Sequence, residues 1–389
     1  RNRDEASVQV QVVADAAPPQ VTVTSHADGA EVEKTGFLLT GLATDDIGVT
    51  SLSATLTDPL LGATISGRTV DVDPDTGRWT LAVLNGQVSE GQTVRVELAA
   101  ADRRGNVTNA AIALHVVGVD FEGYHLISRL TFGSTPALRD EVAAIGPDAF
   151  VAQQLNPAAI DDSAFDAMIA ARPLPATNAQ LQVYELLHAI HSRRQLREVL
   201  TVFWDNHFNT DVNKHRVVAY EVQENDAFRQ AALGNFRTLL GISAKSPAML
   251  LYLDNAMSGA LSPNENYARE LMELHTLGVD GGYSQRDVEQ VARAFTGWQV
   301  ANGQFFFDAA NHHTGAKTVL GRTLPAGRGI EDGEEVLDIL ATHPSTARFV
   351  CEKLSKLFVS DTPPAALVAR CASIFLATGG EITPTVQEI

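Results

Sequence analysis

The hydrophobic pattern of this chain changes its period near residue 118, and that change constrains the fold more than any other feature of the sequence. Before it, short alternating runs such as 52–56 are separated by turn clusters such as 75–77. Such a pattern is typical of an antiparallel β-sandwich. After it, apolar residues recur at helical spacing. The sequence therefore predicts a β-sandwich over residues 14–118 and a large, mostly α-helical domain over residues 119–389.

The β-sandwich is expected to be one module of a tandem array. Residues 105–117 align without gaps on residues 1–13, with an Asn at the second place, an Ala at the sixth and Val-Val at the end. We therefore expect residues 1–13 to be the last strand of a preceding module, and the chain to be part of a longer protein. Segments 43–49 and 100–106 resemble the immunoglobulin-like (Ig-like) repeats of bacterial surface proteins. Trp79 is the expected core aromatic, without the antibody disulfide.

Helices dominate the expected second domain, with one exception. Residues 298–329 do not follow a helical period, and the runs 305–307 and 318–320 predict a small β-hairpin around a loop that carries two histidines. Helices are expected at about 135–155, 180–208, 215–241, 263–277, 285–296, 333–341, 345–358 and 364–377, with a capping box of Ser284 and Asp287 before the fifth.

Residues 262–278 read as a complete helix that carries more ionisable groups than a structural helix needs. Ser262 is the expected N-cap, with Pro263 at the first helical position and Glu265 completing a capping box. Gly278 is expected to close the other end, because a left-handed residue suits a C-terminus. Glu270 has no evident partner within the helix and lies at the edge of its apolar side. It is therefore the most interesting carboxylate of the segment, although a salt bridge to another helix would explain it.

The charge balance argues against nucleic acid and anionic lipid as partners. The chain has 47 acidic against 29 basic residues and a net charge of −18. Such a field repels polyanions and is compatible with divalent cations or neutral substrates. No apolar run is long enough to span a membrane, so no membrane-spanning segment is expected.

Cys351 and Cys371 are the only cysteines, and the sequence leaves their state open. Both fall in expected helices near the C-terminus. A disulfide between those helices in an oxidising compartment and two separate buried thiols are both compatible with the pattern.

Four histidines and one carboxylate are the candidate site residues. His207 follows two aromatic residues at helical spacing, so we favour a buried histidine bonded to a backbone carbonyl over a metal ligand or general base. His275 falls in a last helical turn, where a cation complements the helix dipole. His312 and His313 lie in a loop and have no packing reason to be there. Together with Glu270 they would offer ligands of the type that Zn or Fe uses.

Calcium is a further candidate ligand, in the β-sandwich. Asp45, Asp46 and Asp102 could bind it between modules. Aspartate is also the ordinary residue of turns, and we favour that interpretation.

Several segments, in order, resemble the bacterial domain-of-unknown-function family 1800 (DUF1800). The resemblance covers nearly all of residues 123–389 and implies an exported, mostly helical bacterial domain, often attached to adhesion-type modules. It transfers no catalytic residue, because the family has no established reaction. The family loop usually reads His-Asp before its glycine, whereas this chain has His313 in place of that aspartate. The matching segments are 125–136, 199–210, 265–279, 291–298, 312–321 and 343–361.

Two functions are compatible with these observations. The first is an exported cell-surface or extracellular protein, in which Ig-like modules form a stalk that presents the helical domain to surface proteins or polysaccharide. The second is a metal-assisted hydrolase of an extracellular polymer, with histidines 207, 275, 312 and 313 as ligands and Glu270 or His207 as catalytic base. Nucleophile-elbow, Walker and dinucleotide-binding motifs are absent from the sequence.

Overall fold

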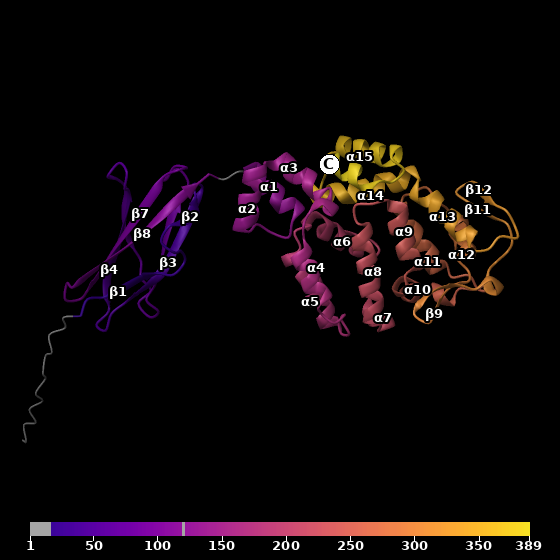
Figure 1. Ribbon diagram of the computed structural model, residues 1–389, viewed down its shortest axis with the longest axis horizontal. Helices are drawn as coiled ribbons and strands as arrows, with labels where there is room; N and C mark the ends of the chain where they lie inside the picture. Colours follow the sequence, from indigo (N-terminus) through magenta and orange to yellow (C-terminus); the bar gives the residue numbers. More distant parts are fainter. Residues whose placement is uncertain (1–16, 119–120) are drawn as a thin grey trace, which may run out of the picture. The chain divides into compact units, whose positions relative to one another are not determined.

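The computed structural model describes residues 17–118 and 121–389 (Figure 1). The chain divides near residue 121 into two compact units, a β unit and a helical unit, which are described separately. A β-rich region followed by a helical region is the order of architectures predicted from the sequence. The strand predicted at residues 1–13 lies outside the described residues.

The β unit consists of two sheets that enclose one apolar core. One sheet has the strand order β1-β3-β6, and the other has the order β2-β8-β7-β4-β5. Neighbouring strands are antiparallel except β2 and β8, which are parallel. The strands are β1 (Gln20–Val23), β2 (Ala30–Glu33), β3 (Gly36–Thr44), β4 (Val49–Asp58), β5 (Ala63–Val70), β6 (Arg78–Leu84), β7 (Thr93–Asp102) and β8 (Val107–Val117).

Alternation along the strands places the core residues of this unit. On β4, Leu52, Ala54 and Leu56 are buried while the residues between them face outward. Successive side chains of a strand point to opposite faces, so this period of two fills one side only. Trp79 on β6 is 2% exposed, which confirms it as the core aromatic.

The acidic turn residues of the β unit hold backbone turns. Asp102 accepts hydrogen bonds from the backbone N–H groups of Arg104 (2.7 Å) and Asn106 (2.9 Å). Asp45 accepts one from Ile47 N at 3.0 Å. These are the roles that the turn interpretation favoured; calcium binding by Asp45, Asp46 and Asp102 stays a prediction.

The helical unit carries two small hairpins among its helices. None of the described helices is both long and apolar enough to cross a membrane. The elements are α1 (Phe121–Leu130), α2 (Pro136–Ile145), α3 (Pro147–Gln154), α4 (Ser163–Ala170), α5 (Asn178–His191), α6 (Gln195–His207), α7 (Val212–His215), α8 (Val218–Ala231), α9 (Phe236–Lys245), α10 (Pro247–Tyr252), α11 (Glu265–Glu273), α12 (Gln285–Ala294), β9 (Trp298–Ala301), β10 (Gln304–Phe307), β11 (Lys317–Val319), β12 (Arg322–Leu324), α13 (Glu331–Ala341), α14 (Pro344–Phe358), α15 (Ala365–Ala377) and α16 (Ile382–Gln387).

Several expectations for the helical unit were wrong in detail. The helices expected over 135–155 and 215–241 are each interrupted, since α2 ends at Ile145 before α3 begins at Pro147, and α8 ends at Ala231 before α9 begins at Phe236. The runs 305–307 and 318–320 do not pair with each other: β10 pairs with β9, and β11 pairs with β12. Each run therefore belongs to a separate hairpin, whose two strands are consecutive in the chain. The helix expected over 180–208 is two helices, because the carboxylate of Asp162 accepts hydrogen bonds from Ser192 Oγ (2.8 Å) and Arg193 N (3.0 Å) and stabilises a break.

The helix expected at 263–277 is shorter in the structure, where α11 begins at Glu265 and ends at Glu273. Asn264 is its N-cap, and its side-chain oxygen accepts a hydrogen bond from Asn266 N at 2.8 Å. The predicted cap, Ser262, instead forms an antiparallel bridge with Gly259. Gly278 adopts a φ of 82°, as expected for the residue that turns the chain after this segment. The capping box of Ser284 and Asp287 is confirmed at α12.

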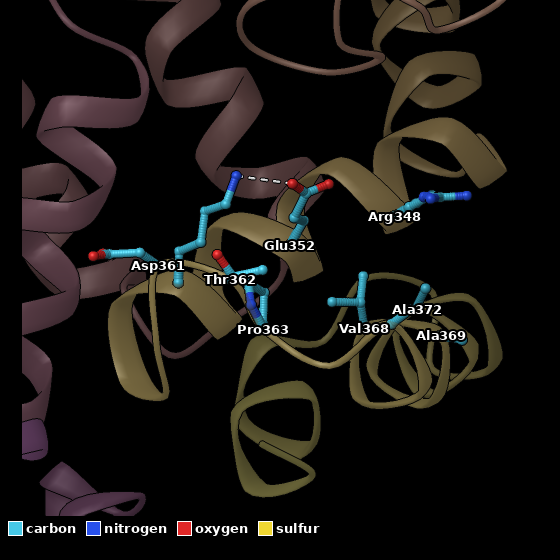
Figure 2. Close-up of a pocket in the computed structure, with 10 residues that line it drawn as sticks. Arg348, Glu352, Asp361, Thr362, Pro363, Val368, Ala369 and Ala372 are labelled. Atoms are coloured by element: carbon cyan, nitrogen blue, oxygen red, sulfur yellow. Dashed lines mark hydrogen bonds and ion pairs between the residues drawn. The ribbon is translucent and has the colours of Figure 1, made fainter.

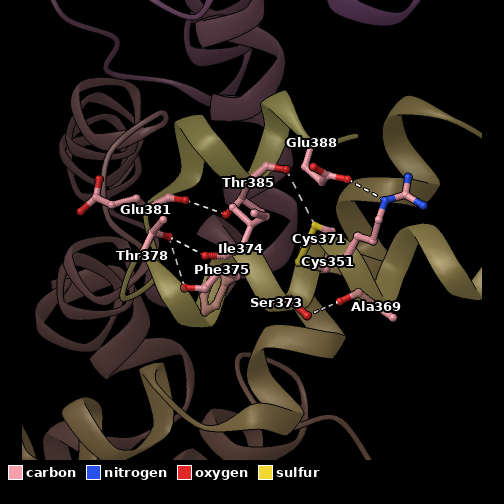
Figure 3. The surroundings of a disulfide bond; sticks show 11 residues. Cys351, Ala369, Cys371, Ser373, Ile374, Phe375, Thr378, Glu381, Thr385 and Glu388 are labelled. Carbon is pink, nitrogen blue, oxygen red and sulfur yellow. Dashed lines mark hydrogen bonds and ion pairs between the residues drawn. A yellow bond between two sulfur atoms is a disulfide. The ribbon is translucent and has the colours of Figure 1, made fainter.

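Cys351 and Cys371 form a disulfide between α14 and α15 (Figure 3). Their Cα atoms are 5.7 Å apart, and both residues are fully buried. The structure thus decides between the two states that the sequence left open. The bond joins helices that are consecutive in the chain and lie side by side in the helical unit.

Replacing both cysteines with alanine should lower the free energy of unfolding by about 3 kcal/mol, because the bridge closes a loop of about 20 residues in the unfolded chain. Urea denaturation followed at 222 nm, which reports on the helices, checks this. Reduction of the native protein should reproduce the loss. A double variant as stable as the oxidised protein would show that the crosslink contributes nothing.

Candidate functional site

Three of the sequence-predicted site residues line one pocket of about 380 Å³ in the helical unit. His207 is the last residue of α6, Glu270 lies on α11, and His275 lies in the turn that follows α11. We call this cavity the His207 pocket. Its other lining residues include Tyr252, Phe349 and Lys353.

His207 is held in one tautomer by its two partners. Its Nε2 lies 2.9 Å from the backbone carbonyl oxygen of His275, and its Nδ1 lies 2.8 Å from Lys353 Nζ. A carbonyl oxygen only accepts, so Nε2 carries the proton and donates it. Nδ1 of the neutral ring is then an acceptor, to which Lys353 donates. The bond to a backbone carbonyl is the one that we favoured from the sequence.

Both histidines of the pocket are neutral at physiological pH. Burial lowers the pKa of the His207 imidazole well below its usual range, and the nearby Lys353 charge lowers it further. Burial and the same charge lower the pKa of His275 to about 3. Charging either ring would bring a second cation next to Lys353 in a site that water reaches poorly.

Lys353 on α14 is the residue that the sequence did not single out. It is half-buried, and this burial lowers the pKa of its ammonium group to about 8. No sequence pattern separates it from Lys356, which follows it by three residues. Lys353 is distinguished by its hydrogen bond to His207, which lies 146 residues earlier in the chain.

Glu270 is the carboxyl group of the pocket. Burial raises its pKa above the usual range, and the neighbouring Glu273 raises it further. The sequence indicated that Glu270 has no partner within its helix, and in the structure its carboxyl group is easier to protonate than usual. The pocket therefore contains a carboxyl group, two neutral imidazoles and an amine.

His312 and His313 have different neighbours from the other candidates. His312 Nδ1 donates to the Thr296 carbonyl oxygen at 2.8 Å, and its Nε2 lies 3.3 Å from Asp332 Oδ2. The same carboxylate oxygen accepts a hydrogen bond from Lys317 Nζ at 2.6 Å. Asp332 and Lys317 are buried, so this cluster is an internal ion-pair network that ties the loop to α13.

The predicted metal ligands therefore lie in different surroundings: His207 and His275 line the His207 pocket, whereas His312 contacts Asp332. Within residues 17–118 and 121–389, no group of three or more His, Cys, Asp or Glu side chains is arranged to hold a metal ion. A neutral imidazole has one lone pair to offer, and that of His207 accepts the hydrogen bond from Lys353. Binding of Zn or Fe by His207, His275, His312 and His313 stays a prediction.

Two further pockets are lined by neighbouring residues of α14. A pocket of about 510 Å³ lies beside the loop at Gly278 and shares Phe349 with the His207 pocket. A third, of about 500 Å³, lies between α14 and α15 (Figure 2) and shares Arg348 and Glu352 with the second. Figure 2 shows Glu352 of α14 together with Val368, Ala369 and Ala372 of α15, which line this pocket. We call these three adjoining pockets the α14 groove.

Comparison with known proteins finds solved structures similar to part of the chain and a family model that matches most of it. CopC from Methylosinus trichosporium OB3b is similar over 26% of this chain and 97% of its own, with 14% identity and a TM-score of 0.22. A modular endo-β-1,4-mannanase from Cellulomonas fimi is similar over 28% of this chain and 20% of its own, with 18% identity and a TM-score of 0.20.

No curated protein matches the sequence significantly. The model of the family described as protein of unknown function (DUF1800) matches residues 125–389. These residues cover α2 to α16 and most of α1, and they include every residue of the α14 groove. The resemblance seen in the sequence motifs is thereby confirmed, and the chain belongs to the DUF1800 family.

Proposed function

We propose that this protein is exported and that its helical unit binds a neutral polysaccharide along the α14 groove. The observation that carries the proposal is the adjacency of three pockets, each of which shares lining residues with the next. Adjoining pockets along one helix suit an extended polymer better than a compact ligand. The β unit would act as an Ig-like stalk that presents the groove.

The groove contains side chains suited to sugars. Phe349 lines two of the pockets and offers an aromatic surface, while Arg348, Glu352 and Asn209 offer hydrogen-bonding groups. Ligand sites of this kind combine apolar walls with a few polar groups that set orientation. The net charge of −18 favours a neutral polymer over an anionic one.

The disulfide between Cys351 and Cys371 supports the exported location. Disulfides persist in oxidising compartments and are rare in the cytosol. A membrane-impermeant biotin reagent applied to intact cells should label the protein if it is displayed at the surface. Recovery of the unlabelled, fully reduced protein from the cytosol would contradict this part of the proposal.

Affinity electrophoresis of the whole chain through gels containing dextran, laminarin or galactomannan tests the polysaccharide site. We expect at least one polymer to retard the protein, and the retardation to fall at least tenfold in apparent affinity when Arg348 and Phe349 are both replaced with alanine. That factor is worth about 1.4 kcal/mol, a modest loss for an aromatic contact together with a polar one.

The matched control is Arg370→Ala. Arg370 is exposed on α15 and pairs with Glu388, and it does not line the groove. Its variant should migrate like the parent chain. Retardation that survives the double substitution, or no retardation of the parent chain in any of the gels, would refute the groove as a polysaccharide site.

A further inference from the structure

Lys353 differs from the other lysines in the partner that it has. The chain contains six lysines, all within the described residues. Five of them form ion pairs with carboxylates. Lys353 is different, because it donates a hydrogen bond to His207 Nδ1, which belongs to a neutral ring, and among the described residues it has no carboxylate partner. The five that form ion pairs with carboxylates are Lys34 with Glu90, Lys214 with Asp254, Lys245 with Glu334, Lys317 with Asp332, and Lys356 with Glu352.

The partner of Lys353 stabilises its charge less than a carboxylate would. His207 cannot supply a negative charge, and its tautomer is held by the His275 carbonyl. The ring of Phe349, 5.3 Å from Lys353 Nζ, is attracted to an ammonium group but more weakly than a carboxylate is. Burial then shifts the balance toward the free amine, as the lowered pKa of about 8 indicates.

The groups around this amine match the needs of carbonyl chemistry. Lys353 is half-buried and lines a pocket of about 380 Å³, which is large enough for a small molecule. Glu270 lines the same pocket and is the carboxyl group there. A neutral amine is the nucleophile that attacks carbonyl carbon, and a nearby acid helps water to leave.

We propose that Lys353 captures small aldehydes or ketones as an imine in the His207 pocket, with Glu270 as the proton donor. This activity uses one end of the groove proposed to bind polysaccharide, but it does not depend on polymer binding. A hydroxyaldehyde such as the open-chain end of a sugar is the class of ligand that suits both sites.

The reaction balances without any oxidant or reductant. The nitrogen lone pair of Lys353 forms a bond to the carbonyl carbon, and a proton moves from nitrogen to the former carbonyl oxygen, giving a carbinolamine. Glu270 protonates that hydroxyl group, which leaves as water while the nitrogen lone pair forms the second C–N bond. The products are a protonated imine and one water molecule, and hydrolysis reverses the steps.

Reductive trapping on the whole chain tests the proposal. The protein is treated briefly at pH 7 with glycolaldehyde and sodium cyanoborohydride, and each lysine is quantified by peptide mass spectrometry. Lys356, exposed one turn further along α14, is the internal control. We expect modification of Lys353 to exceed that of Lys356 at least tenfold, since Lys356 pairs with the Glu352 carboxylate whereas Lys353 is half-buried beside a neutral imidazole.

A second comparison separates a carbonyl site from a merely reactive amine. Glu270→Gln should slow trapping at Lys353 several-fold, whereas Glu265→Gln, an exposed position on the same helix and outside the pocket, should not. Modification of Lys353 no faster than that of Lys356 would overturn the proposal. So would rapid acetylation of Lys353 by an N-hydroxysuccinimide ester without faster aldehyde trapping.

The two proposals can fail independently. Retardation by polysaccharide without aldehyde capture would leave the proposed function and remove the imine. Aldehyde capture without retardation by polysaccharide would support the imine and refute the polysaccharide site.

Discussion

Replacing Asp332 with alanine should lower the free energy of unfolding of the helical unit by about 3–5 kcal/mol, the range for breaking a buried ion pair. Asp332 is fully buried, and its Oδ2 accepts from Lys317 Nζ at 2.6 Å. Arg328 Nε lies 3.2 Å from its Oδ1. Without the carboxylate, buried Lys317 would face only the carbonyl oxygens of His313 and Gly315.

Urea denaturation followed at 222 nm measures the loss in the helical unit, because the β unit contributes little at that wavelength. Asp338→Ala is the matched control: it lies on the same helix, is exposed and pairs with Arg237, and it should cost less than about 1 kcal/mol. A further Lys317→Met substitution should recover much of the loss, since it removes the unpaired charge. An Asp332 variant no less stable than the Asp338 variant would show that the network adds nothing.

Replacing Arg229 with leucine should also cost about 3–5 kcal/mol at pH 7, since it breaks a buried ion pair. Arg229 is 6% exposed on α8, and its Nε lies 2.7 Å from Glu198 Oε2 on α6. Its other guanidinium nitrogens contact Glu185 and Asp226, at 2.6 and 2.5 Å. The substitution would leave the carboxylate of Glu198, itself 2% exposed, without one of its two arginine partners.

The loss in the Arg229 variant should depend on pH. Burial alone would raise the pKa of the Glu198 carboxyl, but its contact with His188 and the charges of Arg229 and Arg197 outweigh burial and hold it at about 2. A depressed carboxyl pKa stabilises the fold above its unfolded value of about 4.5, and this contribution is lost as the pH falls toward 2. The difference between parent and variant should therefore be largest at neutral pH and shrink below about pH 4.

Free energies of unfolding at pH 7, 5, 4 and 3 check this dependence. Arg193→Leu is the control, because Arg193 is exposed and pairs with Glu141; it should cost less than about 1 kcal/mol at every pH. A loss in the Arg229 variant that is constant from pH 7 to pH 3 would mean that lost packing, and not the charge of Glu198, is responsible.

Local patterns predicted the features that depend on neighbours in the chain. The boundary near residue 118, the core position of Trp79 and the capping box at Ser284 follow from period, residue type and short spacing, which act over a few residues. Several predicted helix limits were wrong. The carboxylate of Asp162 interrupts the helix expected over 180–208, and residues 259–262 form a bridge where a cap was expected.

The candidate site also combines features that the local sequence predicted with features that depend on residues distant in the chain. His207, Glu270 and His275 stood out in the sequence by residue type and position, and the structure places all three in one pocket. His312 was grouped with them by residue type alone, and the structure ties it to Asp332 instead. Lys353 had no distinguishing signal, because its chemistry comes from a neutral imidazole and not from its own segment.

The sequence alone determined the two-domain architecture, the family and most helix positions, because these depend on periodicity and on motifs that are local in the chain. The tertiary structure decided that Cys351 and Cys371 are joined, that His207 is neutral and that Lys353 donates a hydrogen bond to it. These properties depend on distances and burial between α6, α11 and α14. Residues brought together from separate helices set one another's protonation, and no single segment contains that information.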